Sequence, residues 1–371
     1  MTTGTNARAM LPVERRARVV ELLRRDGAVR VHELAARLGV SAITVRRDIT
    51  RLAQEGVVRR VHGGATLELP ATAPTSGGRG AGAVTGAVVG LVVPSLVYYW
   101  PDVVRGVREA ADELGLRVVL RGAGYAADDE LRQLGALVDS VGVDGLLVAP
   151  TTTGSQGAAL VDWLRSAEVP VVLLERDSGD PGLGLLESVV SDHRLGAASA
   201  VRHLAELGHR RIGLCASTSS PTAPHLRRGW RQACAELGLE LEGVPEVSTR
   251  DHRDPDWARQ LDALLDRCLE SGTTALLVHS DPEALALVQR CQERGIVVPG
   301  ALSVVTYDDE MAELCEPPLT AVRPPKAAVG RAAVALLAAR LRAGGERPVH
   351  RVVVQPELIT RGSSAAPSAV G

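Results

Sequence analysis

The chain of 371 residues is too long for one ordinary domain and suits two or three. Its hydrophobic content of 45% and charged content of 23% are typical of a globular protein, and its longest apolar runs are too short to cross a bilayer. The formal net charge is −2, yet residues 1–65 hold 13 Arg against 6 Asp and Glu, so a basic beginning precedes an acidic remainder.

This uneven charge indicates that one part of the chain meets a polyanion and the other does not. The first 20 residues carry charge but no apolar segment, so they do not resemble a secretory signal and we expect a cytoplasmic protein. The five cysteines are scattered without a C-x-x-C pair. They predict buried free thiols rather than a metal site or disulfides, and we expect no metal and no cofactor.

Three helices are predicted before residue 66. The first covers residues 12–27, the second is "VHELAARLG", ending at Gly39, and the third runs from an N-cap at Ser41 to Gly56. A helix, a turn with glycine and a second helix have the spacing of a helix-turn-helix motif. We expect residues 1–12 to be disordered.

The third helix separates into an apolar and a basic face. At 100° per residue, Val45, Ile49 and Leu52 fall together and would anchor the helix to a core. The opposite face, which would enter a DNA major groove, carries Ile43, Arg46, Arg47, Thr50 and Arg51. Ser41 and Thr44 would contact phosphates, and we expect Asp48 to orient a neighbouring arginine.

The segment "VVRRVHGG" follows Gly56 and predicts a two-stranded wing. Arg59, Arg60 and His62 would meet the flanking DNA backbone or the minor groove. The alternative is a solvated arginine-rich helix in a small structural domain, but the cap, the glycine turn, the apolar anchors and the wing all agree with DNA binding.

The stretch "VHELAARLGVSAITVRRDITRLAQEGVVRRVHGGA" resembles the DeoR-type winged helix-turn-helix, whose hallmark is VS-x-x-T-[IV]-RRD before a short R-x-HGGA wing. The resemblance covers residues 13–66 and implies binding to double-stranded operator DNA, with Arg46 and Arg47 central. Residues 67–86 are rich in Gly, Ala, Pro, Ser and Thr and predict a flexible linker.

Beyond the linker, short apolar runs alternate with amphipathic helices. Strands that are apolar throughout and separated by helices are typical of parallel sheets covered on both faces. There are too many for one small sheet, so the fold class predicted is a small winged helix-turn-helix followed by an α/β body of two doubly wound subdomains. Segments that read as strands are "AVVGLVV", "RVVL", "GLLVA", "VPVVLL", "RRIGLCA", "TALLVHS" and "ALSVVTY".

Ligands of such folds bind at the carboxyl ends of the strands. Only 2% of residues are aromatic, yet Tyr98, Tyr99 and Trp100 are consecutive at one strand end. They form either a hydrophobic cap or a stacking surface for the apolar face of a sugar, whose hydroxyls Arg176, Asp281 and Asp308 would bind.

The body resembles the sensor domain of the LacI/GalR repressor family, which is similar to periplasmic sugar-binding proteins. The resemblance rests on "VDGLLVAP", "VPVVLLERD", "HLAELGHRRIGL", the pair Gly229–Trp230 and "VPGALSVVTYDDEMAELCEPPLTAVRPP". It implies a homodimer and an effector in a cleft between two subdomains. By position in the family, Ser95, Tyr98, Tyr99, Trp100, Arg176, Asp281 and Asp308 would line that cleft.

The resemblance also sets the expected boundaries. It implies an effector domain at 87–361 whose chain crosses between the two subdomains three times, near Asp192, Tyr307 and Arg323. Subdomain 1 would take about 87–191 plus 307–322, subdomain 2 about 193–305 plus 324–360, and a disordered tail would follow at 362–371.

Two departures from the family pattern stand out. Leu226 occupies the position where the family carries a ligand-binding arginine, so either Arg227 substitutes for that arginine or the ligand differs. The linker, with its glycines and prolines, does not suit the hinge helix that usually joins this sensor to its DNA-binding domain.

The sequence therefore predicts a transcriptional regulator, a repressor of carbohydrate genes controlled by a sugar-like effector, and not an enzyme. A solute-binding protein is disfavoured by the missing signal segment and the basic head. An enzyme fused to a DNA-binding head is disfavoured because we find no nucleophile elbow, phosphate loop or metal spacing, and the histidines are dispersed. His209 in "LGHRR" is interpreted as a helix-end residue.

Overall fold

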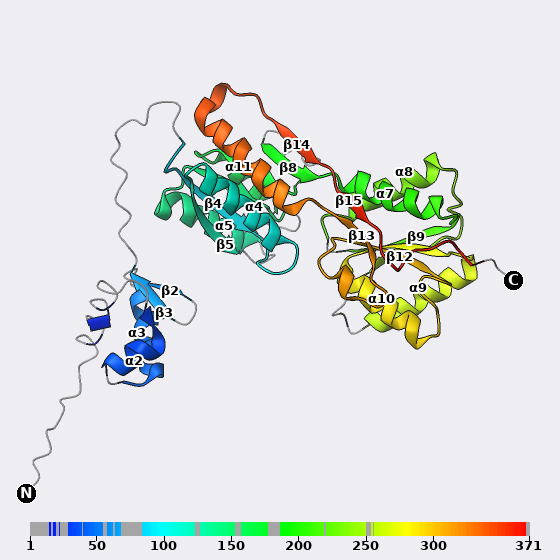
Figure 1. The fold of residues 1–371 in the computed structure, drawn as a ribbon. Helices are drawn as coiled ribbons and strands as arrows, with labels where there is room; N and C mark the ends of the chain where they lie inside the picture. Colours follow the sequence, from blue (N-terminus) through cyan, green and yellow to red (C-terminus); the bar gives the residue numbers. More distant parts are fainter. Residues whose placement is uncertain are drawn as a thin grey trace, which may run out of the picture. The chain divides into compact units, whose positions relative to one another are not determined.

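The computed structural model describes residues 15, 18, 19, 22, 29–38, 40–54, 58–61, 64–67, 84–122, 127–152, 157–176, 186–218, 220–249, 254 and 256–368. They divide into two compact units, which we call the head (within residues 1–78) and the body (within residues 79–371) (Figure 1). The expected disordered segment 1–12 and nearly all of the linker at 67–86 lie outside the described residues.

The head has the predicted helix-turn-helix with a wing. Its elements are β1 (Val29–Arg30), α2 (Val31–Leu38), α3 (Ala42–Gln54), β2 (Val58–Val61) and β3 (Gly64–Leu67). Residues 15, 18, 19 and 22 are helical, as the first predicted helix requires. Val45, Ile49 and Leu52 are buried beside Leu34, so the predicted anchors of α3 are confirmed. The strand β1, which pairs antiparallel with β3, was not predicted.

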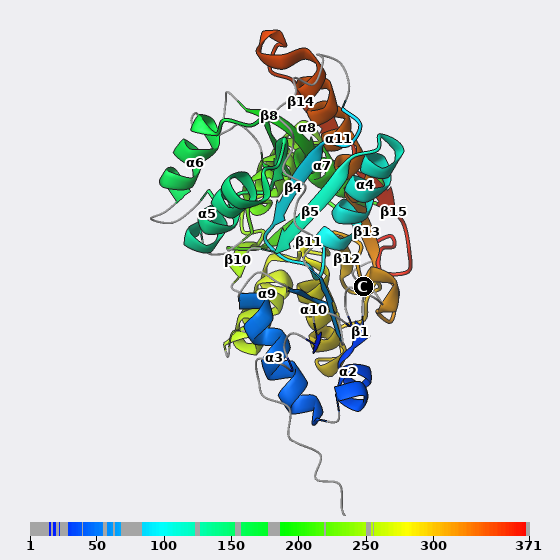
Figure 2. The ribbon, with the colours of Figure 1, turned by 90° about the vertical axis from the view of Figure 1, so that its left-hand side faces the viewer.

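The first lobe of the body is built on a fully parallel sheet of order β14-β8-β7-β6-β4-β5. Its elements are β4 (Val88–Val93), α4 (Trp100–Glu113), β5 (Arg117–Gly122), α5 (Ala127–Ala136), the π-helical turn η1 (Leu137–Val141), β6 (Gly145–Val148), α6 (Gly157–Ser166), β7 (Val171–Leu174), β8 (Glu187–Ser191), α11 (Lys326–Ala343), the 3₁₀ turn η4 (Gly344–Glu346) and β14 (Arg351–Val354). Helices α4 and α11 cover one face, and α5 and α6 cover the other (Figure 2).

The second lobe has a sheet of order β10-β9-β11-β12-β13-β15, parallel except for the pair β13–β15. Its elements are α7 (His193–Glu206), β9 (Ile212–Ser217), α8 (Ala223–Glu236), β10 (Glu246–Thr249), α9 (Trp257–Ser271), β11 (Ala275–His279), α10 (Asp281–Glu293), β12 (Ser303–Tyr307), the 3₁₀ turn η3 (Ala312–Leu314), β13 (Thr320–Arg323) and β15 (Glu357–Ile359). Helices α7 and α8 pack on one face, and α9 and α10 on the other. The predicted class of two doubly wound subdomains is confirmed.

The predicted assignment of the two C-terminal segments, 307–322 to the first lobe and 324–360 to the second, was wrong. Strand β13 pairs with β12, so 307–322 belongs to the second lobe, whereas α11 packs on α4 and β14 pairs with β8, so most of 324–360 belongs to the first. The chain crosses near Asp192, after Arg323 and between β14 and β15. Tyr307 is not a crossing, because it is a fully buried core residue of the second lobe.

The tail is ordered as far as residue 368, contrary to the prediction for 362–371. Ser363 is fully buried; its hydroxyl donates to the Val304 carbonyl and accepts from the Thr320 amide at 2.8 Å. His209 bonds the Ala365 carbonyl through Nε2 at 2.9 Å. Hydrogen bonds from polar side chains hold this segment in place. Its composition of small and polar residues, without an apolar run, gave no sign of that order.

Two glycine contacts set the helix packing. A Cβ at Gly106 of α4 would lie 2.0 Å from the Ala327 carbonyl oxygen of α11, and one at Gly229 of α8 would lie 2.0 Å from the Arg194 carbonyl oxygen of α7. The aromatic partner of Gly229, Trp230, is buried and donates to the Ile212 carbonyl at 2.9 Å. The Gly-aromatic pair therefore fixes α8 against both α7 and β9.

All five cysteines are free thiols, four of them buried and Cys315 half-buried, as predicted. Burial raises the pKa of Cys215 and Cys234 to about 12. Within the described part of the chain, the structure holds no helix with both the length and the apolar character needed to span a membrane.

Candidate functional site

The candidate DNA surface lies on α3 and the wing. The Ser41 hydroxyl accepts from the Thr44 amide at 3.2 Å and bonds the Thr44 hydroxyl at 2.9 Å, which confirms the N-cap. Arg47 and Arg51 are exposed. The side chains of Ile43, Arg46, Thr50, Arg59 and Arg60, and all of His62, lie outside the described residues.

Asp48 behaves as predicted. Its carboxylate is buried and accepts from Arg15 of the first helix, with Nε 2.5 Å from Oδ2. This pair raises the pKa of Arg15, chiefly through the hydrogen bond to Asp48. The contact fixes α3 to the first helix of the head.

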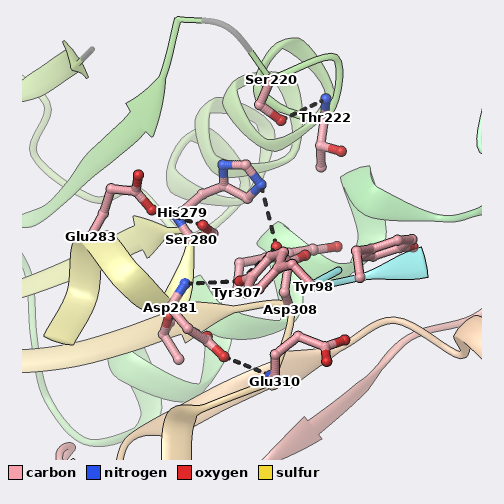
Figure 3. A network of polar contacts seen from close by, with 12 residues as sticks. Tyr98, Ser220, Thr222, His279, Ser280, Asp281, Glu283, Tyr307, Asp308 and Glu310 are labelled. Atoms are coloured by element: carbon pink, nitrogen blue, oxygen red, sulfur yellow. Dashed lines mark hydrogen bonds and ion pairs between the residues drawn. The ribbon is translucent and has the colours of Figure 1, made fainter. Parts of the chain in front are cut away.

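In the body, polar side chains from both lobes meet at the carboxyl ends of the strands (Figure 3). Tyr98, in the loop after β4 of the first lobe, donates its hydroxyl to Asp308 Oδ2 of the second lobe at 3.2 Å. The Tyr98 hydroxyl oxygen in turn accepts from the Asp281 amide at 3.3 Å. One tyrosine hydroxyl thus joins the ends of β11 and β12 to the opposite lobe.

Both aspartates are buried, and their environments differ. Asp281 accepts from the Thr306 hydroxyl at 2.8 Å and from the amides of Glu310 and Met311 at 2.6 and 2.8 Å. The backbone carbonyl of Asp308 accepts a hydrogen bond from Lys326 Nζ, and its carboxylate Oδ2 lies 3.8 Å from His279 Nε2. Burial raises the pKa of each carboxyl to about 6. Asp308 therefore holds a costly charge that a ligand donor could stabilise.

The neighbouring residue Asp309 faces the other way, as expected of adjacent carboxylates at a strand end. It pairs with Arg323 at 2.6 Å and with Arg361 at 2.8 Å. Although burial opposes its ionisation, these two guanidiniums lower the pKa of Asp309. Asp309 ties the crossing after β13 to the second lobe.

A second cluster centres on the buried carboxylate of Glu175, at the end of β7. It accepts from the Tyr99 hydroxyl at 2.6 Å, from the Ser191 amide and hydroxyl at 2.9 and 2.7 Å, and lies 3.4 Å from His193 Nε2. Burial alone would raise the pKa of Glu175, but these donors, led by His193, lower it to about 2. His193 Nδ1 in turn bonds the Tyr307 hydroxyl at 3.1 Å.

The histidines that are dispersed in sequence gather here in space. The rings of His193 and His279 lie 5.8 and 6.0 Å from the Tyr307 ring, and His225 lies 6.4 Å from His193. Burial lowers the pKa of His279 to about 4, so its ring is neutral at pH 7. Its Nδ1 is buried and has no hydrogen-bond partner among the described residues.

The backbone at this junction is strained. Tyr98, Glu175, Asp308 and Asp309 have φ values of 57°, 51°, 102° and 54°, and they are the non-glycine residues with positive φ in the described part of the chain. Side chains with a Cβ rarely adopt this conformation, and such strain persists where the surroundings impose it, often at functional sites.

The structure brings together Tyr98, Asp281 and Asp308 of the predicted ligand residues, but not the stacking surface. Trp100 is a core residue only 5% exposed, and Tyr98 uses its hydroxyl across the lobes. Tyr99 packs partly on the same core, with Lys326 Nζ 5.3 Å from its ring centroid.

The remaining predicted ligand residues make local contacts. Ser95 closes a turn with Val97, and Arg176 donates to the carbonyls of Pro150 and Glu175 at 2.7 and 2.8 Å. Arg227 pairs with Glu246 at 2.5 Å and does not join the cluster around Asp308.

Sequence reasoning missed Glu175, His193 and Lys326. Glu175 stands in the strand-end motif "ERDSG", and Lys326 is the lone lysine of the chain, so both carried a signal. His193 had none, since its role depends on the crossing between lobes. Among the described residues, no group of three or more His, Cys, Asp or Glu is arranged to hold a metal ion.

Two family models match the chain. The DeoR-like helix-turn-helix domain matches residues 15–69, and the periplasmic binding protein-like domain matches residues 201–364.

Relatives match over both units. An uncharacterized HTH-type transcriptional regulator in the aml 5' region of Streptomyces limosus is 34% identical over 290 residues, covering 74% of this chain and 78% of the relative. The HTH-type transcriptional regulator DegA of Bacillus subtilis (strain 168) is 28% identical over 341 residues, covering 90% and 98%. A solved structure of the transcriptional regulator CelR in complex with cellobiose is 25% identical with a TM-score of 0.64, covering 91% of this chain and 100% of that one.

Proposed function

Because the chain belongs to the LacI-like HTH-type transcriptional regulators, here with a DeoR-like head, we propose that it represses carbohydrate-metabolism genes until a small sugar-like effector binds between the lobes of its body. DNA binding and transcriptional regulation come with the family. The effector class, the binding residues, the sign of regulation and dimerisation are our proposals.

The observation that carries the effector site is the contact of Tyr98 with Asp281 and Asp308 across the lobes. A hydroxyl already occupies the position between a buried carboxylate and a backbone amide. A sugar hydroxyl offers the same donor and acceptor, and would replace that of Tyr98 without leaving Asp308 unpaired. Cellobiose in the solved relative is a ligand of this chemistry.

An effector that replaces this contact changes how the lobes meet. The lobes are joined by three crossings, so they can reorient as units about those segments. The effector controls DNA binding only if it binds two arrangements of the body with different affinity and the head responds to that difference.

The head would bind a duplex through α3. Arg47 and Arg51 are exposed on the face opposite Val45 and Ile49, and they would enter the major groove with the predicted neighbours Ile43, Arg46 and Thr50. Ser41 and Thr44 at the N-cap, with Arg59, Arg60 and His62 of the wing, would contact the backbone. A homodimer in the cytoplasm would then recognise an operator of two half-sites.

The protein would act by binding rather than by catalysis. The clustered carboxylates already have partners: Glu175 has Tyr99, Ser191 and His193, and Asp281 has Thr306 and two backbone amides. Such a site holds a polar ligand through fixed donors and acceptors.

A panel of sugars tests this proposal. The melting temperature of the full chain is measured with each sugar, and each stabilising sugar is added to the protein bound to DNA from its own upstream region. We expect one sugar to raise the melting temperature and to release the DNA. If DNA binds but no sugar stabilises the protein or releases the DNA, the proposed effector class is wrong.

A further inference from the structure

A cavity of about 290 Å³ lies beside the Glu175 cluster, where the edge strand β14 and its neighbour β8 in the first lobe face the starts of α7 and α8 of the second. Both lobes line it. Its basic side chains are Arg194 of α7, Arg228 and His225 of α8 and Arg351 of β14. Its size is at the low end for small-molecule sites, enough for one small group of a ligand.

The acidic residues lining this cavity are engaged elsewhere. Glu175 accepts from Tyr99 and Ser191 and lies against His193, and Asp192 caps α7 by accepting from the Leu195 amide at 2.9 Å. The cavity is thus lined by three arginines against two carboxylates, and both carboxylates have other partners.

Two of the arginines have donors to spare. Arg228 is exposed and makes no hydrogen bond or ion pair with any residue in the described part of the chain. Arg194 donates from one nitrogen to Gln232 at 2.8 Å, and a guanidinium has five N–H donors. The close approach of α8 to α7 at Gly229, next to Arg228, brings both side chains to one cavity.

The helices add to the positive potential. Asp192 and Thr222, the N-caps of α7 and α8, both line the cavity, so the positive ends of two helix dipoles lie beside it. A planar guanidinium binds the oxygens of a phosphate or carboxylate in pairs. A neutral sugar carries no negative charge that could pair with these arginines and helix ends.

We propose that this cavity binds an oxyanion group, the phosphate monoester or carboxylate of an anionic sugar, with Arg228 and Arg194 as its principal ligands. The inference rests on the proposed function, in that the same effector would place hydroxyls at Asp308. The cluster Glu175–His193–Tyr307 joins the two places by direct contacts.

Inorganic phosphate is the first probe, titrated into the full chain at constant ionic strength and followed by calorimetry. We expect Arg228→Ala to weaken phosphate binding about 10- to 100-fold, the loss for one charge-assisted hydrogen-bonding group. Arg231→Ala is the matched control, since Arg231 lies on the same helix but pairs with Glu246 at 2.8 Å. Because both arginines are exposed, neither change should alter folding.

The comparison of glucose, glucose 6-phosphate and glucuronate then separates the sources of the anion. The phosphate ester or the sugar acid should bind more tightly than glucose to the wild type, and this advantage should vanish in Arg228→Ala. Equal phosphate binding by wild type, Arg228→Ala and Arg231→Ala means an adventitious ion only and overturns the inference.

The two proposals fail in different ways. If neutral sugars release DNA equally from wild type and Arg228→Ala and no anion binds, the cavity proposal is wrong and the proposed function stands. If phosphate binding depends on Arg228 while no sugar or sugar anion releases DNA, the cavity proposal stands and the proposed function is wrong.

Discussion

Replacement of Asp308 by asparagine should make the body more stable at neutral pH. The side chain keeps its shape and still offers an oxygen to the Tyr98 hydroxyl, but it no longer ionises. In the wild type, burial raises the pKa of Asp308 from 3.8 to about 6, so the folded protein binds a proton more tightly than the unfolded chain does.

The size of the effect follows from this pKa. A rise of roughly two units at about 1.4 kcal/mol each means that ionising Asp308 costs the folded body about 3 kcal/mol at pH 7. Stability from this group is fully present below about pH 4 and is lost as pH rises to about 6. We therefore expect Asp308→Asn to gain about 1–3 kcal/mol at pH 7.5 and almost nothing at pH 4.

Urea unfolding from pH 4 to 8, followed by tryptophan fluorescence, measures this difference. The four tryptophans, Trp100, Trp163, Trp230 and Trp257, all lie in the body, so the signal reports that unit. Asp309→Asn is the matched control. Arg361 and Arg323 lower the pKa of Asp309 against the effect of burial, so this variant should lose stability at pH 7.5 and lose less on acidification.

The reasoning fails if Asp308→Asn is destabilised at pH 7.5 as Asp309→Asn is. The attraction of Asp308 to Lys326, His193 and Tyr98 would then exceed the cost of its burial. In that case the ionised Asp308 would stabilise the folded body by itself and would not need a ligand donor to offset the cost of its charge.

Three further changes test other parts of the account. Gly229→Ala should lower stability by about 2 kcal/mol or more in urea unfolding, because its Cβ would meet the Arg194 carbonyl oxygen, whereas Gly135→Ala, with a nearest contact of 3.8 Å, should be neutral or stabilising; equal effects would refute the packing argument. Arg47→Ala should weaken operator binding in an anisotropy titration by at least about tenfold, while Arg37→Ala, which removes a surface pair with Glu33 on α2, should change it little; unchanged affinity in Arg47→Ala would rule out α3 as the recognition helix. Ser363→Val should cost about 1–3 kcal/mol by leaving the Thr320 amide and the Val304 carbonyl buried without partners, and an unaltered unfolding curve would show that the C-terminal segment adds nothing.

Local patterns account for what the sequence predicted well. Six of the seven apolar runs became strands buried on both faces of a sheet, and the seventh became the more exposed edge strand β5. Val45, Ile49 and Leu52 became core because a helix repeats every 3.6 residues. The edge strands β10 and β14 were missed, since most of their residues are only half-buried or exposed and they form no apolar run that is buried throughout.

The sequence predicted only those site residues that directly follow an apolar strand. Asp281 and Asp308 follow apolar strands and were found, but the partner of a strand end depends on how the lobes meet. Tyr98 and Trp100 are two residues apart in sequence, yet Tyr98 bonds across the lobes and Trp100 begins α4 in the core. The reversed assignment of the C-terminal segments has the same origin, because β14 takes its place by pairing with β8, a strand distant in sequence.

The most direct test of the central claim is the release of operator DNA from Asp308→Ala, measured by fluorescence anisotropy as the sugar that releases the wild type is added. The account predicts that Asp308→Ala binds DNA with wild-type affinity and remains bound at sugar concentrations that release the wild type. Release of both proteins at the same concentration would contradict it and place the effector site elsewhere.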